Sequence, residues 1–252
     1  MRSIKISSAT ILVFVLACSG MPFSHQDTAA SLQRALDEGD RSDADKARDA
    51  GRKPAAVLAF LGIEPGMTVV DLIAAGGWYT EVLSLAVGPE GRVYAQNPAF
   101  VLKFRDGAND KAITGRLAGG RLANVVRLDQ ELGELEIQPG SLDAAITAQN
   151  YHDIHNSRGP EAASAFLNGV MALLRPGGTL GIIDHSGGVG DDKELHRIDQ
   201  ALVEQAAINS GFEIVASSEL LRNPADDRRQ SVFGPEIRGK TDRFVLRLRK
   251  PS

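Results

Sequence analysis

The stretch DLIAAGGWYT, residues 71–80, follows the apolar run TVV and precedes EVLSLAV, a run with helical character. An apolar strand, a turn that contains glycine and an apolar helix in succession are typical of a βαβ unit. Gly76 and Gly77 lie in the turn, where the lack of a Cβ permits positive φ and lets a ligand approach the backbone. The stretch therefore predicts a parallel α/β sheet with a candidate ligand-binding turn at its first crossover.

From Pro54 onward the chain continues this alternation of strand-like and helical segments. β-Branched and apolar runs that end in turn residues mark the strands, and apolar residues at helical spacing mark the helices. No internal repeat of fixed period is visible. The expected strands are 68–73, 92–97, 124–129, 142–149, 179–184, 212–217 and 243–249, and the expected helices are 54–61, 78–87, 99–118, 160–174 and 193–210.

The last expected strand has a cleaner alternation than the others. Phe244, Leu246 and Leu248 share one face, while Arg247 and Arg249 share the other. Such a pattern is typical of an antiparallel strand near the edge of a sheet, because one of its faces meets solvent.

The order of segments resembles that of the class I S-adenosylmethionine-dependent methyltransferases, whose seventh strand inserts antiparallel beside the fifth. The resemblance runs from about Pro54 to Lys250 and includes LRPGG at 174–178, a turn that commonly introduces their fifth strand. More narrowly, the chain resembles a group of methyltransferases predicted from sequence, some of which carry export signals. The resemblance implies an α/β fold with a Rossmann-like, seven-stranded, mostly parallel sheet, helices on both faces and an antiparallel last strand, and S-adenosyl-L-methionine as cofactor.

In that fold the first strand ends in an acidic residue, and the turn has the pattern D/E-x-G-x-G-x-G. Asp71 matches the acidic position, whereas Ile73, Ala75 and Gly77 stand at the three glycine positions. The resemblance implies that Asp71, Ala75, Gly76 and Gly77 contact the cofactor. Because a β-branched residue at positive φ is strained by about 1 kcal/mol or more, we expect the backbone at Ile73 to stay extended. Its side chain is then expected where the amino acid end of the cofactor binds.

Two further strand ends correspond to cofactor contacts in the family. Gln96 or Asn97 stands where the family has an acid that binds both ribose hydroxyls, and an uncharged acceptor bonds more weakly by about 1 kcal/mol. Asn97 equally suits a turn before Pro98. Asp129, after the third strand, matches the position that bonds the adenine amino group, or it is a turn or cap residue. The fingerprint G-x-G-x-x-G cannot be placed in the turn, so an NAD-dependent reductase is the weaker interpretation.

The segment after the fourth strand, QNYHDIH at 149–155, is the candidate reaction centre, because open α/β sheets bind ligands at the carboxyl ends of their strands. Gln149 is assigned to the cofactor side, and Asn150 resembles the Asn found there in quinone-pathway methyltransferases. Tyr151 is expected to form a wall of the methyl-transfer site. His152 is the candidate base for a protic acceptor, because imidazole titrates near neutrality. The alternative is that the histidines are hydrogen-bonded surface groups.

A metal site is not expected from the sequence. Asp153, Asp184, His152 and His185 could gather a cation, but His152 and His155 are three residues apart in an expected loop. They lack the i,i+4 spacing of a helical zinc motif. The segment 221–240 is expected to be a long loop that either covers the substrate side or only connects two strands.

The first eighteen residues, MRSIKISSATILVFVLAC, have the pattern of an export signal. Two basic residues precede an apolar run at 9–17 that is far shorter than the ~20 residues needed to span a bilayer, so a cleaved signal is expected. VLAC at 15–18 resembles a bacterial lipobox, which implies a lipid anchor on Cys18 and a periplasmic or outer-membrane lipoprotein. The alternative is an incidental thiol in a plain signal. Cys18 is the only cysteine, so an intramolecular disulfide is excluded.

The composition suits one soluble α/β domain. The chain has 252 residues, of which 43% are hydrophobic and 24% charged. Residues 19–53 are polar and are expected to form a tether and a peripheral helix before the domain at 54–252. Without residues 1–17, which hold two of the 28 Lys+Arg, 26 basic residues face 32 acidic ones, a formal charge of −6. This charge argues against general binding of nucleic acid.

Two functional hypotheses follow. The first is an exported or membrane-tethered enzyme that transfers a methyl group from S-adenosylmethionine to an unidentified small molecule. The second is a catalytically degenerate methyltransferase-fold lipoprotein that acts as a binding or scaffold domain. Ile73 and the missing ribose acid favour the second hypothesis, as does the cytosolic origin of the cofactor.

Overall fold

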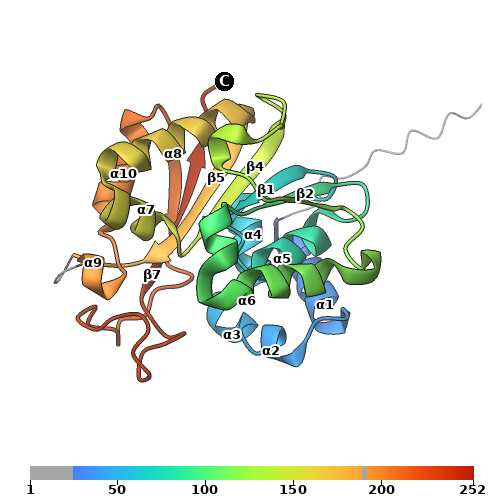
Figure 1. Cartoon of the computed structure of the whole chain (residues 1–252), viewed down its shortest axis with the longest axis horizontal. Helices are drawn as coiled ribbons and strands as arrows, with labels where there is room; N and C mark the ends of the chain where they lie inside the picture. Colours follow the sequence, from blue (N-terminus) through green and yellow to red (C-terminus); the bar gives the residue numbers. More distant parts are fainter. Residues whose placement is uncertain (1–24, 189–191) are drawn as a thin grey trace, which may run out of the picture.

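The structure, a computed structural model, describes residues 25–188 and 192–252 (Figure 1). The expected signal at 1–18 and its Cys18 lie outside the described residues. Within the described part of the chain, no helix is both long enough and apolar enough to cross a membrane.

Seven strands form one sheet in the order β3-β2-β1-β4-β5-β7-β6. The first five pair in parallel, and the seventh inserts antiparallel between the fifth and the sixth. This confirms the expected Rossmann-like, mostly parallel sheet with an antiparallel last strand. The strands are β1 (Thr68–Leu72), β2 (Arg92–Gln96), β3 (Val125–Leu128), β4 (Leu142–Ala148), β5 (Leu174–His185), β6 (Glu213–Ser218) and β7 (Arg243–Arg249).

Helices cover both faces of the sheet, as expected. Figure 1 shows α7, α8 and α10 grouped on one side and α1, α4 and α5 on the other. The helices are α1 (His25–Glu38), α2 (Asp43–Lys46), α3 (Asp49–Arg52), α4 (Pro54–Leu61), α5 (Trp78–Val87), α6 (Ala99–Leu117), α7 (Tyr151–Arg158), α8 (Pro160–Leu173), α9 (Asp192–Leu195) and α10 (Gln200–Asn209), with short 3-10 turns at Ala118–Gly120 and Leu132–Glu134.

The alternation of side chains along each strand divides the core into two layers. In β1, Val70 and Leu72 pack in the cluster under α7, α8 and α10, whereas Val69 packs in the cluster under α1, α4 and α5. All three side chains are buried. Burial of a side chain of this size stabilises the fold by about 1.5–3 kcal/mol, so the two layers together hold the sheet rigid beneath the loops at its carboxyl edge.

Several expected boundaries were wrong. The segment 151–155 is helical rather than a loop, because Asp184 of β5 accepts a hydrogen bond from the His152 backbone N–H and so caps α7. The expected helix 193–210 is two helices, because Ile198 pairs with the end of β5 between them. The helix α6 has non-helical dihedrals at 104–107. The LRPGG segment forms the start of β5.

The register of the sheet brings three strand ends to one place. Leu72 of β1 lies level with Gln96 of β2 and with Thr147 of β4. The loop after β1, the residues after β2 and the residues after β4 therefore leave the sheet together, which is the edge where α/β sheets bind ligands.

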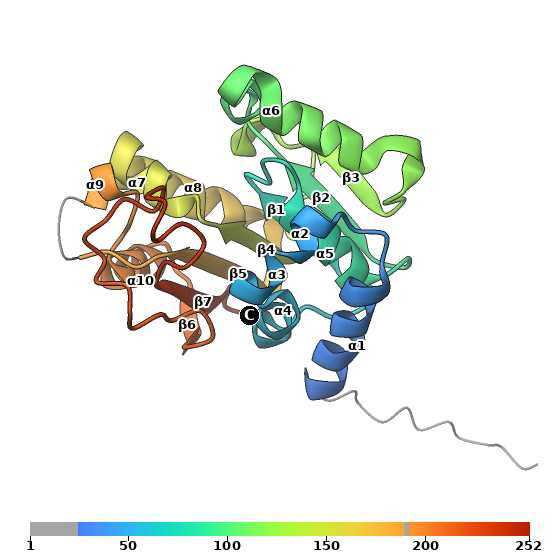
Figure 2. The same cartoon turned by 90° about the horizontal axis from the view of Figure 1, so that it is seen from below.

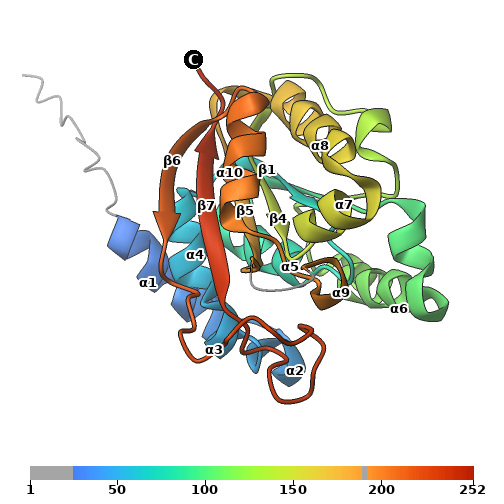
Figure 3. The ribbon, with the colours of Figure 1, turned by 90° about the vertical axis from the view of Figure 1, so that its left-hand side faces the viewer.

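The polar segment before Pro54 packs against this edge rather than forming only a tether. The Arg243 guanidinium, at the start of β7, donates a 2.6 Å hydrogen bond to the Gly51 carbonyl, and Lys53 donates one of 2.8 Å to the Leu220 carbonyl. Figures 2 and 3 show α2 and α3 on the same side of the sheet as the long loop that precedes β7. The expected loop at 221–240 is confirmed, and it meets the N-terminal helices beside the candidate site.

The insertion of β7 generates a stability prediction. Leu246 is fully buried between β5 and β6, so we expect Leu246→Ala to lower the free energy of unfolding by about 3 kcal/mol. Urea denaturation measures this loss. Leu202→Ala, on the half-exposed face of α10, is the matched control and should change stability by less than ~0.5 kcal/mol. Equal effects of the two substitutions would contradict the assigned position of β7.

Candidate active site

The loop between β1 and α5 adopts a left-handed backbone at every glycine position of the family pattern. The φ angles are +55° at Ile73, +50° at Ala75 and +77° at Gly77. The expectation that Ile73 stays extended was wrong. Its side chain is half-buried and packs against the core cluster under α7 and α8.

Side-chain amides from the neighbouring strand ends hold this conformation. The Gln96 side-chain oxygen accepts a 3.0 Å hydrogen bond from the Ile73 N–H, and the Asn97 oxygen accepts one of 2.8 Å from the Ala75 N–H. Asn97 Nδ2 donates to the Ala75 carbonyl at 3.1 Å, and Asn150 Nδ2 donates to the Ile73 carbonyl at 3.2 Å. A left-handed L-residue costs roughly 1–2 kcal/mol, and each bond contributes about 1 kcal/mol. The free energy that the four bonds contribute therefore roughly offsets the strain at the two left-handed residues.

These bonds also define the roles of the amides at the end of β2. Both polar atoms of the Asn97 side chain bond Ala75, and the Gln96 side chain also donates to the Gln130 carbonyl at 2.7 Å. Both amides are buried. The ribose contact predicted for Asn97 stays a prediction, and in this structure its amide positions the loop.

Asp71, in β1, directs its carboxylate to the first turn of α5. The buried carboxylate accepts a 2.7 Å hydrogen bond from the Thr80 hydroxyl, and the positive end of the helix dipole favours its charge. Burial raises the pKa of Asp71 to about 7, although the Thr80 bonds and the Arg52 charge oppose the rise. The side chain is therefore near its titration point at neutral pH.

Arg52, at the end of α3, brings a positive charge beside this loop. Its guanidinium lies 4.6 Å from the centroid of the Trp78 ring and 5.8 Å from that of Tyr79. It donates a 2.9 Å hydrogen bond to the side-chain oxygen of Gln149, a residue with φ of +62°. Burial lowers the pKa of Arg52 to about 10, and the Arg48 charge adds to the effect. Arg52 therefore stays charged at neutral pH, and the hydrogen bond found for it in the described residues goes to a neutral oxygen.

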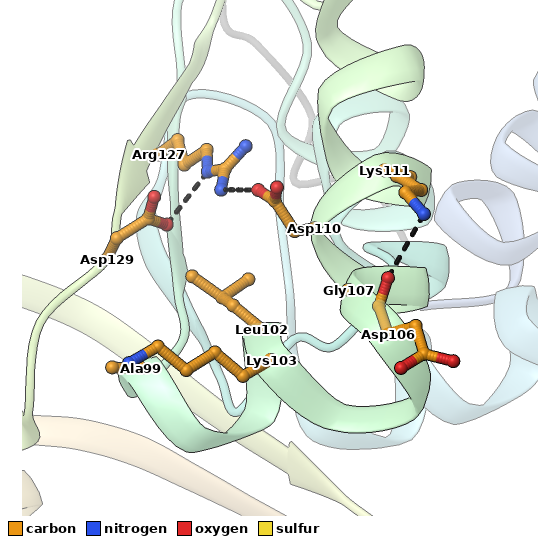
Figure 4. A pocket seen from close by; sticks show the side chains of 9 residues that line it. All are labelled: Ala99, Leu102, Lys103, Asp106, Gly107, Asp110, Lys111, Arg127 and Asp129. Atoms are coloured by element: carbon orange, nitrogen blue, oxygen red, sulfur yellow. Dashed lines mark hydrogen bonds and ion pairs between the residues drawn. The ribbon is translucent and has the colours of Figure 1, made fainter.

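Asp129 lies at a pocket of about 560 Å³ between α6 and the end of β3. Figure 4 shows Arg127 between the carboxylates of Asp129 and Asp110, and the Arg127 Nε to Asp129 Oδ1 distance is 2.8 Å. Among the nine residues that line the pocket, Asp129 is the one that the sequence placed in the cofactor site. Its predicted adenine contact stays a prediction.

Tyr151 and His152, at the start of α7, are both buried but have different neighbours. Tyr151 is fully buried in the core, its ring meets that of Phe166 edge to face with the centroids 6.2 Å apart, and its hydroxyl finds no hydrogen-bond partner among residues 25–188 and 192–252. His152 is also buried, but its Nδ1 lies 2.6 Å from Asp184 Oδ1. The wall role of Tyr151 is not tested by these contacts.

His152 belongs to a chain of charged and polar side chains that includes Asp153 and Asp184, as the sequence suggested, and also His196, which the sequence did not indicate. Its Nε2 lies 3.3 Å from Asp153 Oδ1, and the same oxygen lies 2.9 Å from His196 Nδ1. Burial lowers the pKa of His152, but the carboxylates of Asp184 and Asp153 outweigh it and raise the pKa to about 10. In this arrangement the imidazole is protonated at neutral pH, which is the state of an acid or a charge partner rather than of a base.

The other histidines of the expected site point elsewhere. His185 Nδ1 lies 2.7 Å from the Thr241 hydroxyl, and burial lowers the pKa of His185 to about 3 although the Asp184 charge opposes it. His155 Nδ1 lies 3.0 Å from Asn156 Oδ1. Arg52 and His196 were missed, because each reaches the site from a segment whose own pattern carries no motif.

Solved structures share this fold. A SAM-dependent methyltransferase from Aquifex aeolicus is 20% identical, with a TM-score of 0.61 over 88% of this chain and 97% of that chain. Fibrillarin from Aeropyrum pernix with natively bound S-adenosyl-L-methionine is 16% identical, with a TM-score of 0.53 over 80% and 76%. The [4+2]-cyclase SpnF is 16% identical, with a TM-score of 0.58 over 91% and 97%. No family model and no curated protein sequence matches the chain. The chain has the fold of the class I S-adenosylmethionine-dependent methyltransferases.

Alanine is usually more stable than glycine at a given position, and the left-handed backbone at residue 73 predicts the opposite order there. We expect Ile73→Gly to be more stable than Ile73→Ala by about 1 kcal/mol, since both remove the side chain and only glycine is unstrained at positive φ. At Ile208, on the exposed face of α10, the free energy of unfolding should instead be about 1 kcal/mol higher for Ile208→Ala than for Ile208→Gly. Urea denaturation of the four variants measures both differences, and the same order at both sites would contradict the conformation of the loop.

The raised pKa of Asp71 predicts a pH-dependent stability. Because the folded pKa of about 7 exceeds the ordinary 3.8, the folded state binds the proton more tightly, and stability falls as the pH rises between these values. We expect Asp71→Asn to gain stability relative to the native chain across this window, by a few kcal/mol at about 1.4 kcal/mol per pKa unit. Denaturation at pH 4, 6 and 8 measures the difference. A difference that does not change with pH would refute the assignment.

Proposed function

We propose that this chain binds S-adenosylmethionine and transfers its methyl group to a small molecule. The observation that carries the proposal is the loop 73–77, whose backbone is left-handed at all three glycine positions although two of them hold Ile and Ala. Strain of this kind persists only where surrounding contacts impose it, and it gathers at functional sites. The same edge of the sheet is where α/β folds bind ligands.

The residues around this loop suit the charges of the cofactor. Ile73, Ala75 and Gly76 are half-buried, so the loop surface is accessible to a ligand. Arg52 forms no salt bridge in the described part of the chain, so its guanidinium is available to a carboxylate of the ligand, and the buried Asp71 beneath the loop adds negative charge that favours an ammonium group nearby. When bound, S-adenosylmethionine supplies an activated methyl group, so the protein's task is chiefly orientation.

The acceptor side of the proposed site begins where β4 ends. Gln149 bonds Arg52, and Asn150 bonds the Ile73 carbonyl, so the first residues after β4 are locked to the cofactor loop. His152 follows two residues later on the same edge and is oriented by Asp184. An acceptor beside His152 would meet a positioned polar group, and Phe233 of the long loop before β7 contacts the neighbouring His196 ring.

The location that we propose is outside the cytosol. The support is the signal-like segment at 1–18, which ends in the lipobox-like VLAC, and the polar residues that follow it. A lipid on Cys18 would hold the domain at the periplasmic face of a membrane, because stable anchoring needs a lipid or a long apolar helix.

The alternative is a domain that keeps the fold but not the transfer, and one observation favours it. Gln96 and Asn97 hold the loop with the polar atoms that would otherwise face a ribose, and no carboxylate replaces them at the end of β2. The fold alone does not decide between these activities, since a named [4+2]-cyclase shares it. In this alternative, the chain is a lipoprotein that acts as a binding or scaffold domain.

Calorimetric titration of the full chain with S-adenosylmethionine and S-adenosylhomocysteine tests the proposal. We expect one site, and a ~10–100-fold loss of affinity for Arg52→Gln, because a charge-assisted hydrogen bond contributes about 1.5–3 kcal/mol. Arg48→Gln is the matched control: its guanidinium lies 5.5 Å from the same Trp78 ring, and it should bind normally.

The outcomes separate the two versions of the function. An absence of heat at millimolar ligand would count against both the cofactor and the methyltransferase. Binding together with incorporation of labelled methyl groups into a cell extract would eliminate the degenerate version. Binding without incorporation into any extract would favour the binding domain.

A further inference from the structure

Three side chains with metal-ligating atoms converge at the carboxyl ends of β4 and β5. His152 and Asp153 belong to the first turn of α7, and His196 follows α9, more than forty residues later. One ligand atom of each lies within 4.8 Å of the other two. The Asp153 Oδ1 is shared, at 3.3 Å from His152 Nε2 and 2.9 Å from His196 Nδ1.

Asp184 fixes the orientation of the buried member of this group. Its Oδ1 lies 2.6 Å from His152 Nδ1, and its Oδ2 accepts a 2.8 Å hydrogen bond from the His152 backbone N–H. With Nδ1 engaged, the other ring nitrogen, Nε2, faces Asp153 and the His196 ring, whose centroid lies 5.7 Å away. A carboxylate behind a histidine in this way is the usual support of a metal-binding imidazole.

We propose that His152, Asp153 and His196 bind a divalent cation of the borderline class, for which Zn²⁺ is the representative ion. Two imidazoles and one carboxylate are a common protein donor set for Zn²⁺ and leave a fourth position for water or a substrate oxygen. At bond lengths of about 2.0–2.2 Å, neighbouring ligands of a tetrahedral ion lie roughly 3.3–3.6 Å apart, near the 3.3 Å found between His152 and Asp153.

The other ligand pairs need only small movements. The two imidazole atoms lie at most 4.8 Å apart and would close by about 1 Å around an ion of this size. His196 and Asp153 have the freedom to do so, because their side chains are 36% and 55% exposed. The His152 ring, at 4%, is the fixed member.

The charges around the group also suit a dication. Asp153 and Asp184 approach His152 from opposite sides, so two carboxylates face one imidazole. The Phe233 ring packs edge to face against that of His196, with the ring centroids 4.8 Å apart, and gives this partly exposed imidazole one fixed neighbour. A Zn²⁺ ion on His152 Nε2 would take the place of the proton shared with Asp153, and it would lower the pKa of a water or hydroxyl bound in its fourth position.

Metal binding is tested without any activity measurement, so its failure is distinct from that of the proposed function. The full chain is stripped with a chelator and titrated with Zn²⁺, and bound metal is counted by elemental analysis after desalting. We expect one equivalent in the native chain and at least a ~100-fold weaker affinity in His196→Ala and Asp153→Asn. Asp184→Asn, which removes the support of His152, should weaken binding by about 10–100-fold.

His155→Ala is the matched control, because this histidine lies on the same helix and contacts Asn156 instead of the group. Its affinity should equal that of the native chain, and circular dichroism confirms that each variant is folded. Stoichiometric binding that His196→Ala loses and His155→Ala keeps would support the site. An absence of binding by the native chain, or equal binding by these two variants, would overturn it.

Discussion

Hydrogen bonds from three side-chain amides hold the loop after β1 in a backbone conformation that its own residues disfavour. Gln96, Asn97 and Asn150 reach it from the ends of β2 and β4, and their bonds offset roughly the strain at two left-handed L-residues. These amide hydrogen bonds fix the path of the chain from β1 into α5. They therefore set the position of α5, the burial of Asp71 beside its first turn and the accessible face of the loop. The site therefore has the backbone of a ligand-binding turn with bulkier side chains.

The four residues after β4 connect the two halves of the site. Gln149 bonds Arg52 on the proposed cofactor side, Asn150 bonds the Ile73 carbonyl, and His152 bonds Asp184 on the proposed acceptor side. Tyr151 lies between them in the core and anchors the segment by burial. A ligand that moves Arg52 would therefore act, through Gln149, on the same short segment that contains His152. These contacts are the same whether the domain transfers a methyl group or only binds.

The fold followed from the sequence because local patterns encode it. β-Branched and apolar runs that end in turn residues predicted the strands, and the alternation in the last strand predicted an antiparallel strand near a sheet edge. Its insertion beside β5 was implied by the family resemblance. The site followed only in part. The backbone of Ile73 was wrong because distant amides outweigh its local preference, and α7 was missed because its cap comes from Asp184. Arg52 and His196 were missed because they meet the site only through tertiary contacts, which spacing along the chain does not reveal.

The most direct test of the account is a high-resolution crystal structure of the full chain grown with S-adenosylhomocysteine. The account predicts positive φ at Ile73 and Ala75, intact amide bonds from Gln96 and Asn97, and the ligand on this loop with its carboxylate at Arg52. An extended backbone at Ile73, or a loop that excludes the ligand at millimolar concentration while the amides stay in place, would contradict it.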